Sequence, residues 1–600
     1  PYELHLTDKY PNLCASLQLS SDFETSSIDN VNGVISIDSL KLSNNNKHYS
    51  LNNISLTSKV TKSNHIEIKS DFISGFISGN YTIASLRNSL LNIASKTLPI
   101  INNITTYPIP QNDNNLKFFI EIEDTKQVCD IFEIPWALRK HTMISGFLND
   151  KTSDFGVDCY ISKLNNNTTN INNINLKIRN ENKKLLMLAN AVTKIKNDTL
   201  SLFMDIEGMQ DTLVTHIEVE NSQQNIINAG ELLFKTYLQN SNEGIIANTH
   251  IFPTDIVADN KTWNIAPADI STNFKWLTVK GFSIKSDDDQ NIIINGKAST
   301  SKEDKIDINL NDINLDYISS LLPDDSSVEF GGRVSGAATV YSAFDIPLFN
   351  ADVTANDFVF NRSHFGKAHA TSNFDFTNKT INFYGVVTNN DEKQDTTAIL
   401  TGAYFLMNDS LDIKGDARRL DLRFLSYYLH TIFDDVQGKG TGQVHIHGFS
   451  KTMQTDVEVK AFAEDALLKV AYLQSAFTFS DSIILTPTEI LLRNIEIKDM
   501  HGNKGHINGK LSHRFFQNMD YRINIDCDHL QVLNTTKQDN PDFYGTAFAT
   551  GKAVIQGNDK GTHISCNAKT ERNSRLIIPM GEASAAQNNF ITFVDNNTYV

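Results

Sequence analysis

The residues that could most readily form a binding site lie between positions 438 and 448. The run Gly438-Lys-Gly-Thr-Gly442 resembles a phosphate-binding loop. Such loops need a following helix whose N-terminal amides face the anion. The next residues, Val444-His-Ile-His-Gly448, alternate as a β-strand does. We therefore expect no nucleotide site here.

Two histidines of this predicted strand could act together. His445 and His447 have the i, i+2 spacing that places both imidazoles on one face of a strand, where they could chelate a metal ion. The sequence assigns no third ligand, and both positions fall on the expected solvent face. We therefore expect surface histidines and no metal. Asp287-Asp-Asp289 lacks the glycine and terminal glutamate of a calcium loop, which favours a turn.

No recognisable catalytic motif is present. GxSxG, HExxH and Cys/His arrangements of known type are missing from the sequence. No spacing selects a pair among the 70 acidic residues. A polysaccharide-active β-helix would need clustered carboxylates and a coil repeat of roughly 20 to 30 residues. We therefore expect a protein that is not an enzyme and has no cofactor.

The five cysteines have no metal-binding or redox spacing, and their odd number prevents complete pairing within the chain. Cys159, Cys527 and Cys566 alternate in step with apolar neighbours. This pattern is typical of small buried hydrophobic residues. The other two are Cys14 and Cys129.

The charge and hydropathy patterns exclude further classes. A net charge of −17 opposes nucleic-acid binding, which needs a basic surface. The short basic runs Lys183–Lys184 and Arg418–Arg419 are expected to be solvated. No apolar run of membrane-spanning length and no signal peptide is found. Because the chain opens on Pro1 and stops abruptly at Val600, we expect a piece of a longer protein whose membrane anchor lies outside it.

The elements that must position these residues are strands. Apolar and polar residues alternate in segments such as Ile306–Leu310, Val457–Val459 and Ile523–Cys527. Turn-forming residues separate such segments every 10 to 15 residues or so. This pattern predicts a long antiparallel meander.

A repeat organises the strands. Glycines 230, 336, 442 and 551 lie at intervals of 106, 106 and 109 residues, and in each copy the second and fourth following residues are apolar. Alternate residues of a strand share a face, so these positions are predicted to form one apolar face, which the family resemblance given below implies to be the lining of a groove. They are Leu232, Phe234, Ala338, Val340, Val444, Ile446, Ala553 and Ile555.

Three segments have helical spacing and are expected to cross or cap the sheet. Their apolar positions are Leu86, Leu90, Ala94 and Leu98; Leu315, Ile318, Leu321 and Leu322; and Leu422, Leu425, Leu429 and Ile432. A string of immunoglobulin-like domains is disfavoured, because linkers and a Cys–Trp–Cys pattern are missing.

Several segments carry a family resemblance. They are Trp276–Lys285, Ile292–Ser301, Ile308–Leu322, Thr262–Pro267, Leu348–Val353, Tyr544–Gly551 and Phe590–Val594. Together they resemble the body of TamB-type, AsmA-like proteins of the Bacteroidetes type, clearly from about residue 180 to 600 and more weakly before. These motifs are structural, so they identify a lineage more securely than an activity.

The resemblance implies a fold and a division of the chain. The fold is all-β: an elongated, curved antiparallel β-groove, or β-taco, with a few short amphipathic helices. Residues 1–180 would form its N-terminal part, and 181–310, 311–415 and 416–520 the repeats around Gly230, Gly336 and Gly442. Residues 521–600 would begin a truncated C-terminal TamB-type domain.

The resemblance also implies a function. It implies a periplasmic protein of a Gram-negative bacterium, anchored in the inner membrane, whose groove carries phospholipid acyl chains toward the outer membrane. An Omp85-type, TamA-like barrel and outer-membrane proteins would be its partners. One alternative is a periplasmic scaffold or adhesin that binds partner strands.

The predicted apolar face is physically compatible with a groove. A sheet with one apolar face and few helices must curl on itself or leave a trough, because large exposed apolar surfaces are normally avoided. Acyl chains could fill such a trough, at about 0.8 kcal/mol for each buried CH₂ group. In the alternative, the two walls pack together as a solid β-sandwich solenoid. The resemblance favours the groove.

Overall fold

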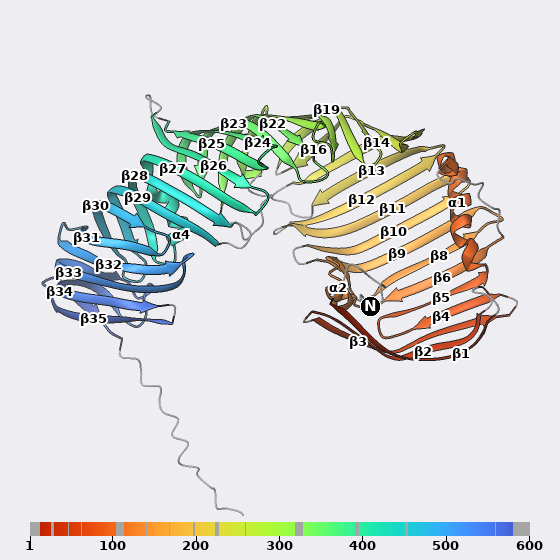
Figure 1. Ribbon diagram of the computed structural model, residues 1–600, viewed down its shortest axis with the longest axis horizontal. Helices are drawn as coiled ribbons and strands as arrows, with labels where there is room; N and C mark the ends of the chain where they lie inside the picture. The colour runs from red at the N-terminus through yellow and green to blue at the C-terminus, as the bar shows by residue number, and fades with distance from the viewer. Residues whose placement is uncertain are drawn as a thin grey trace, which may run out of the picture. The chain divides into compact units, whose positions relative to one another are not determined.

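The computed structural model describes residues 12–25, 29, 31–45, 47–61, 63–103, 113–139, 141–166, 169–195, 198–221, 227–258, 260–317, 328–390, 395–449, 454–558 and 560–579. Within them, antiparallel strands and a few short helices make up the regular structure, which confirms the predicted all-β class (Figure 1). The chain divides into two compact units. Unit 1 is residues 1–308 with 341–347, and unit 2 is residues 309–340 with 348–600.

Unit 1 contains four helices and the first twenty strands. The helices are η1 (Ile83–Ser85), α1 (Leu86–Thr97), η2 (Pro99–Asn103) and α2 (Lys126–Ile131) among the described residues. The strands are β1 (Leu13–Thr25), β2 (Val31–Asn44), β3 (Lys47–Val60), β4 (Asn64–Lys69), β5 (Ile73–Asn80), β6 (Asn115–Ile122), β7 (Ala137–Leu138), β8 (Thr142–Asn149), β9 (Asp154–Asn165), β10 (Asn170–Glu181), β11 (Lys184–Ile195), β12 (Asp198–Met209), β13 (Thr212–Asn221), β14 (Ala229–Ser241), β15 (Gly244–Ile251), β16 (Thr254–Ala258), β17 (Lys261–Ile265), β18 (Ala268–Thr272), β19 (Trp276–Ser286) and β20 (Asn291–Ser299).

Unit 2 follows β21 (Lys305–Asn314), which crosses the boundary between the units. Its described helical segments are residues 315–317, η3 (Leu422–Phe424) and α4 (Leu425–Leu429). Its strands are β22 (Phe330–Tyr341), β23 (Leu348–Phe360), β24 (Ser363–Asp375), β25 (Thr380–Thr388), β26 (Thr396–Phe405), β27 (Ser410–Asp421), β28 (Phe433–Phe449), β29 (Gln454–Val470), β30 (Ser475–Leu485), β31 (Glu489–Asp499), β32 (Lys504–Arg514), β33 (Gln517–Thr535), β34 (Tyr544–Asn558), β35 (Gly561–Thr570) and β36 (Arg575–Ile577).

Sequence neighbours are also sheet neighbours in both units. In unit 1, each strand from β1 to β6 pairs with the next, β6 pairs with β8, and consecutive pairing runs from β8 to β14. In unit 2, consecutive pairing runs from β23 to β35. Most of these pairs are joined by short turns, whereas α1 lies in the longer connection between β5 and β6. The meander predicted from the turn spacing is confirmed.

Helices α1 and α2 lie at opposite ends of the unit 1 strands (Figure 1). Helix α1 connects β5 to β6, and α2 follows β6 at its other end. Ile93 of α1 is 1% exposed and packs with Tyr81, Leu116 and Leu148 into a core. This core closes one end of the unit 1 sheet.

The buried face of α1 differs from the predicted one. Leu90, expected on the apolar face, is 46% exposed, whereas Ser89, Ile93 and Thr97 are buried. The buried hydroxyls are bonded: Ser89 Oγ donates to Asp150 Oδ2 at 2.7 Å, and the Thr97 hydroxyl donates to the Asn180 side chain. A polar group can be buried when its hydrogen bonds are made, and spacing of apolar residues does not reveal this.

In unit 2, helices η3 and α4 follow the predicted segment from Leu422, although Ile432 lies beyond the helix end and is exposed. Phe424 of η3 packs against Phe360 and Phe365, with ring centroids 6.3 and 5.9 Å apart. Phe358 and Phe330 extend this aromatic cluster. The third predicted helix, with Leu315, Ile318, Leu321 and Leu322, falls largely on residues outside the described ranges.

The repeated glycines stand where neighbouring strands approach closely. A Cβ on Gly442 of β28 would lie 2.2 Å from the carbonyl oxygen of Lys460 on β29. Gly336 of β22 meets Asp352 of β23 in the same way and has φ +147°. Both the space and this φ favour glycine, which explains why these positions punctuate the repeat.

The α1 core predicts a difference between two substitutions on one helix. Ile93→Ala should lower the free energy of unfolding by about 2–5 kcal/mol, because it leaves a cavity under α1. Leu90→Ala should change it by no more than about 0.5 kcal/mol, because that side chain is exposed. Urea unfolding followed by circular dichroism measures both. Equal midpoints for the two variants would contradict the observed helix face.

A pH-dependent stabilisation is predicted at Asp421, which caps η3. Burial raises its pKa, but hydrogen bonds from the Arg423 side chain and backbone and from Lys439 outweigh burial and lower the pKa from 3.8 to about 2. The carboxylate therefore stabilises the fold above pH 4, and this contribution is lost as the pH falls toward 2. Asp421→Asn should cost about 2 kcal/mol at pH 7 and much less at pH 2. Thermal unfolding at both pH values tests this, and a pH-independent cost would contradict it.

Candidate apolar binding face

The strand register of unit 1 builds one continuous apolar face. Directly opposed residues of paired strands point to the same side of a sheet. Starting from Leu232 of β14, successive partners back to β2 form one row. This row is Leu232, Ile217, Met204, Ala189, Leu176, Cys159, Ile144, Ile120, Gly75, Ile68, Leu56 and Ile35. No charged residue interrupts it.

A second row runs beside the first, two residues further along each strand. It is Phe234, Thr215, Ile206, Met187, Ile178, Val157, Gly146, Phe118, Ile77 and Ile66. The next row includes Leu116 and Leu148, which are buried beneath α1. These rows define what we call the apolar face of unit 1, and α1 marks which side of the sheet it lies on.

Most residues of the two rows are half-buried, apart from Thr215, which is buried, and Leu56, which is exposed. Ile217, Met204 and Ile144 are neither buried nor fully exposed, in contrast to Leu116 and Leu148 at 5% exposure. Closely packed interiors leave apolar side chains almost no accessible surface. The apolar face beyond the α1 core therefore retains accessible hydrocarbon surface along its length.

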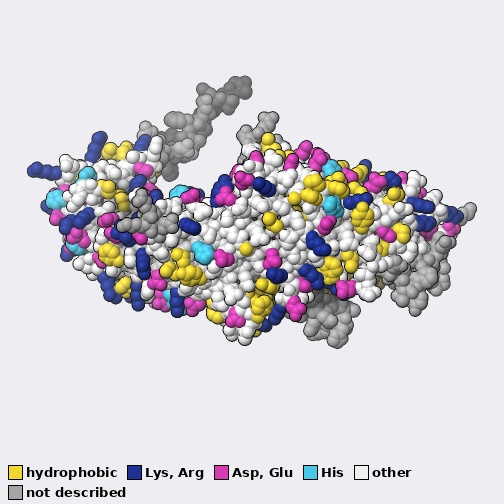
Figure 2. Space-filling model, turned by 90° about the horizontal axis from the view of Figure 1, so that it is seen from above, with side chains coloured by type: hydrophobic (Ala, Val, Ile, Leu, Met, Phe, Trp, Pro, Cys, Tyr) yellow, Lys and Arg dark blue, Asp and Glu magenta, His cyan; other side chains and the backbone are white. Residues whose placement is uncertain are grey.

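The opposite side of the same strands is mixed. Leu233, next to Leu232, is 40% exposed and lies opposite His216, and Arg179 pairs with Asp158 at 2.6 Å. Leu186 and Leu188 are exposed here too. Charged and apolar side chains mixed in this way are typical of a solvated sheet face. Figure 2, which views the molecule from above, shows positive and negative side chains interspersed with hydrophobic ones.

Unit 2 has an equivalent apolar face. Val444 lies opposite Gly415 and Val459, and the row continues through Leu400 and Ala370 on one side and Leu485 on the other. Ile446 lies opposite Ile413 and Val457. Further along, Ile555 is opposite Ile523 and Ile564, and Ala553 is opposite Ile525 and Cys566.

The eight predicted groove residues are all half-buried. Leu232 and Phe234 lie in unit 1, and the other six lie on β22, β28 and β34 of unit 2. Gly336 lies against Val353, so Ala338 and Val340 share the face of that residue. The repeat marks only a few of the strands. Residues of the face that precede the first repeated glycine, such as Ile120, Ile144 and Met204, could have been found by extending the alternation strand by strand.

The structure shows where the other residues singled out from the sequence lie. Gly438–Gly442 lies within β28, so the expected strand is confirmed. Asp287–Asp289 forms a turn in which Asp288 pairs with Lys261 at 2.8 Å. His445 and His447 lie on the face opposite Val444 and Ile446, where Nε2 of His445 is 3.0 Å from Asp412 Oδ1.

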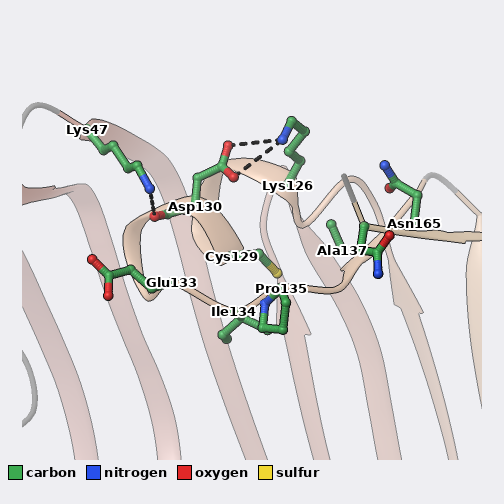
Figure 3. Close-up of a pocket in the computed structure, with 10 residues that line it drawn as sticks. Lys47, Lys126, Cys129, Asp130, Glu133, Ile134, Pro135, Ala137 and Asn165 are labelled. Carbon is green, nitrogen blue, oxygen red and sulfur yellow. Dashed lines mark hydrogen bonds and ion pairs between the residues drawn. The ribbon is translucent and has the colours of Figure 1, made fainter. Parts of the chain in front are cut away.

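A small cavity of about 190 Å³ lies beside α2 and offers no catalytic arrangement (Figure 3). Three of its charged lining residues, Lys47, Lys126 and Asp130, interact with one another. Lys47 donates to the backbone oxygen of Asp130 at 2.9 Å, and the Asp130 carboxylate pairs with Lys126 at 3.3 Å. Cys129 is buried there, and its lining contains no histidine that could act as a base.

The cysteines divide by burial. Cys129 and Cys527 are buried and Cys159 is half-buried, in line with the small hydrophobic role predicted for Cys159 and Cys527. The expectation of burial for Cys566 is wrong, because it stands on β35, whose side chains are exposed throughout. Burial, together with Asp526 and Cys566, raises the pKa of Cys527 to about 11.

The comparisons with known proteins identify one region. Residues 493–598 match the family model described as the TamB C-terminal domain. The match begins within β31 and includes the core of Ile495, Ile497, Cys527 and Leu530. It confirms the resemblance stated from the sequence. No curated protein and no solved structure matches the chain.

Thiol labelling of the native chain should follow this division. A maleimide at pH 7.5 should modify Cys14 and Cys566, which are exposed, while Cys527 stays protected because it is buried and remains a thiol. Peptide mass spectrometry before and after denaturation measures each site. Rapid modification of Cys527 in the native chain would contradict the packing of β31 to β34.

Proposed function

We propose that this chain, a member of the TamB-like family of outer-membrane translocation and assembly proteins by its C-terminal domain, is a non-enzymatic carrier of phospholipid acyl chains. The acyl chains would move along the apolar faces of both units, between the inner and outer membranes. The proposed location is the periplasm, with an inner-membrane anchor supplied outside these residues. An Omp85-type, TamA-like barrel is the proposed outer-membrane partner. No helix among the described residues is long and apolar enough to cross a membrane.

The uncharged rows through Leu232 and Phe234 are the observation on which this proposal rests. They run across the strands, so their direction is that of the sheet's length. At about 4.8 Å per strand, the row from β2 to β14 extends on the order of 50 Å, more than the roughly 30 Å of a bilayer's hydrocarbon core. The row is therefore long enough to keep contact with an acyl chain over a distance greater than the membrane interior that the chain leaves.

The energetics favour passage over tight binding. Each methylene moved from water onto the face gains about 0.8 kcal/mol when fully covered. Because the side chains of the rows are alike from strand to strand, a chain displaced by one strand exchanges equivalent contacts. A surface of this kind holds hydrocarbon without one preferred position, as transport requires.

A second candidate function rests on β1, the first strand of unit 1. It pairs with β2, and its side chains are exposed along nearly its whole length, with Leu17 at 55% and Leu19 at 52%. An exposed apolar edge strand can accept an incoming strand. A scaffold for outer-membrane proteins would use this edge rather than the apolar face.

Two adjacent leucines provide the test. Leu232→Asp should reduce phospholipid co-purifying with the chain, and its transfer between vesicles, by about tenfold or more, because a charge on the face must be desolvated. Leu233→Asp should leave both unchanged, because that side chain points to the opposite, solvated side. Lipid mass spectrometry and a vesicle transfer assay measure the effect, with circular dichroism as the folding control.

Photo-crosslinking separates the two candidate functions. A crosslinking residue at Phe234, Val340 or Ile446 should label phospholipid, and one at Leu233 should not. Equal labelling at Phe234 and Leu233 would exclude the apolar face as the carrier. Lipid-free chain that captures unfolded outer-membrane strands through β1 would support the scaffold.

A further inference from the structure

The polar side of unit 2 gathers histidines and carboxylates on three adjacent strands. His445 and His447 lie on β28, on the side opposite Val444 and Ile446. On β29, Glu458 lies opposite His445 and Asp456 opposite His447. On β27, Lys414 lies opposite His445 and Asp412 opposite His447.

The donor atoms of three of these side chains already converge. The ring centroids of His445 and His447 are 4.5 Å apart. His447 Nε2 lies 3.6 Å from Glu458 Oε1, and one ligand atom from each of the three residues lies within 4.8 Å of the others. Glu458 is the third ligand that the sequence could not assign, because the pairing of β28 with β29 brings it there.

A tetrahedral zinc ion, with bonds of about 2.0–2.1 Å, keeps its ligands about 3.3 Å apart. Small rotations of exposed side chains would close the distances seen here to that value. Two imidazoles and a carboxylate suit zinc and similar divalent transition metals, rather than calcium or magnesium. Asp412 is not one of the metal ligands in this arrangement. Its contact with His445 at 3.0 Å orients that ring.

We propose that His445, His447 and Glu458 bind one divalent transition-metal ion of the zinc class. The ion would join β28 to β29 on the polar side and brace these two 17-residue strands. His445 and His447 are about one-third exposed, at 33% and 35%, so water can complete the coordination. The site does not depend on the proposed lipid function, because the same strands present their apolar side chains on the other side.

A second group, Glu121, Glu123 and His141, is a weaker candidate. It offers one imidazole, His141 is 70% exposed, and its Nδ1 lies 4.0 Å from Glu121. Ordering an exposed side chain costs conformational entropy, and here a single imidazole offers fewer nitrogen ligands in return. It serves as the natural control for nonspecific zinc binding.

Zinc titration of the 600-residue chain tests the site. The chain is purified without a polyhistidine tag, stripped with a chelator and titrated with ZnCl₂ in a calorimeter. One equivalent should bind, and His447→Gln or Glu458→Gln should weaken it at least about tenfold. Two control variants should leave the zinc affinity unchanged. His141→Gln removes the imidazole of the weaker group, and His369→Gln removes the contact between His369 and Asp352 at 2.8 Å.

Hydrogen exchange provides a second readout. Zinc should slow exchange of the β28 and β29 amides in the parent chain and in His369→Gln, but not in His447→Gln. Absence of stoichiometric binding would overturn the proposal. The proposal would also be overturned if His141→Gln or His369→Gln weakened zinc binding as much as His447→Gln does. Circular dichroism verifies that each variant is folded.

Discussion

The register of antiparallel pairing is the constraint on which the rest of this structure depends. Side chains alternate across a strand, so a shift of one residue would exchange the two sides of the sheet. In the observed register Leu232 joins the row of Ile217 and Met204, while Leu233 faces His216. Both the apolar faces and the histidine cluster exist because this register is kept from strand to strand.

A sheet of this kind has little of its own to cover its apolar side. In unit 1, α1 buries Leu116 and Leu148 at one end of the strands, with Ile93 at the centre of the contact. In unit 2, Phe424 of η3 closes an aromatic cluster with Phe360 and Phe365. These helices are short, so they anchor parts of the sheet and leave neighbouring rows half-buried. The cores around Ile93 and Phe424 therefore stabilise the fold, whereas the half-buried rows beside them keep the apolar faces accessible.

The two sides of one strand can serve separate purposes. On β28, Val444 and Ile446 lie in the apolar rows, while His445 and His447 face carboxylates of β27 and β29. A metal brace on the polar side would stiffen the sheet without occupying the path proposed for acyl chains. The arrangement would also hold the register that both sides need.

Strand alternation, the glycine repeat and the lack of recognisable catalytic motifs could all be predicted from the amino-acid sequence, because each is a pattern of residue types along the chain. It also identified the half-buried positions at Leu232, Val444 and Ile446, since period-2 alternation survives into any strand. The family resemblance, carried by motifs such as Tyr544–Gly551, was also recognised from the sequence alone.

Which residues meet across strands, and which face of a helix is buried, could be seen only once the strands and helices were packed together. Glu458 joins His447 through β28–β29 pairing, which the spacing of either strand does not specify. Ser89 and Thr97 replaced Leu90 on the buried side of α1, because Asp150 and Asn180 satisfy their hydroxyls. Cys566 is exposed despite its apolar neighbours, since burial depends on what lies above a strand and not on its own sequence.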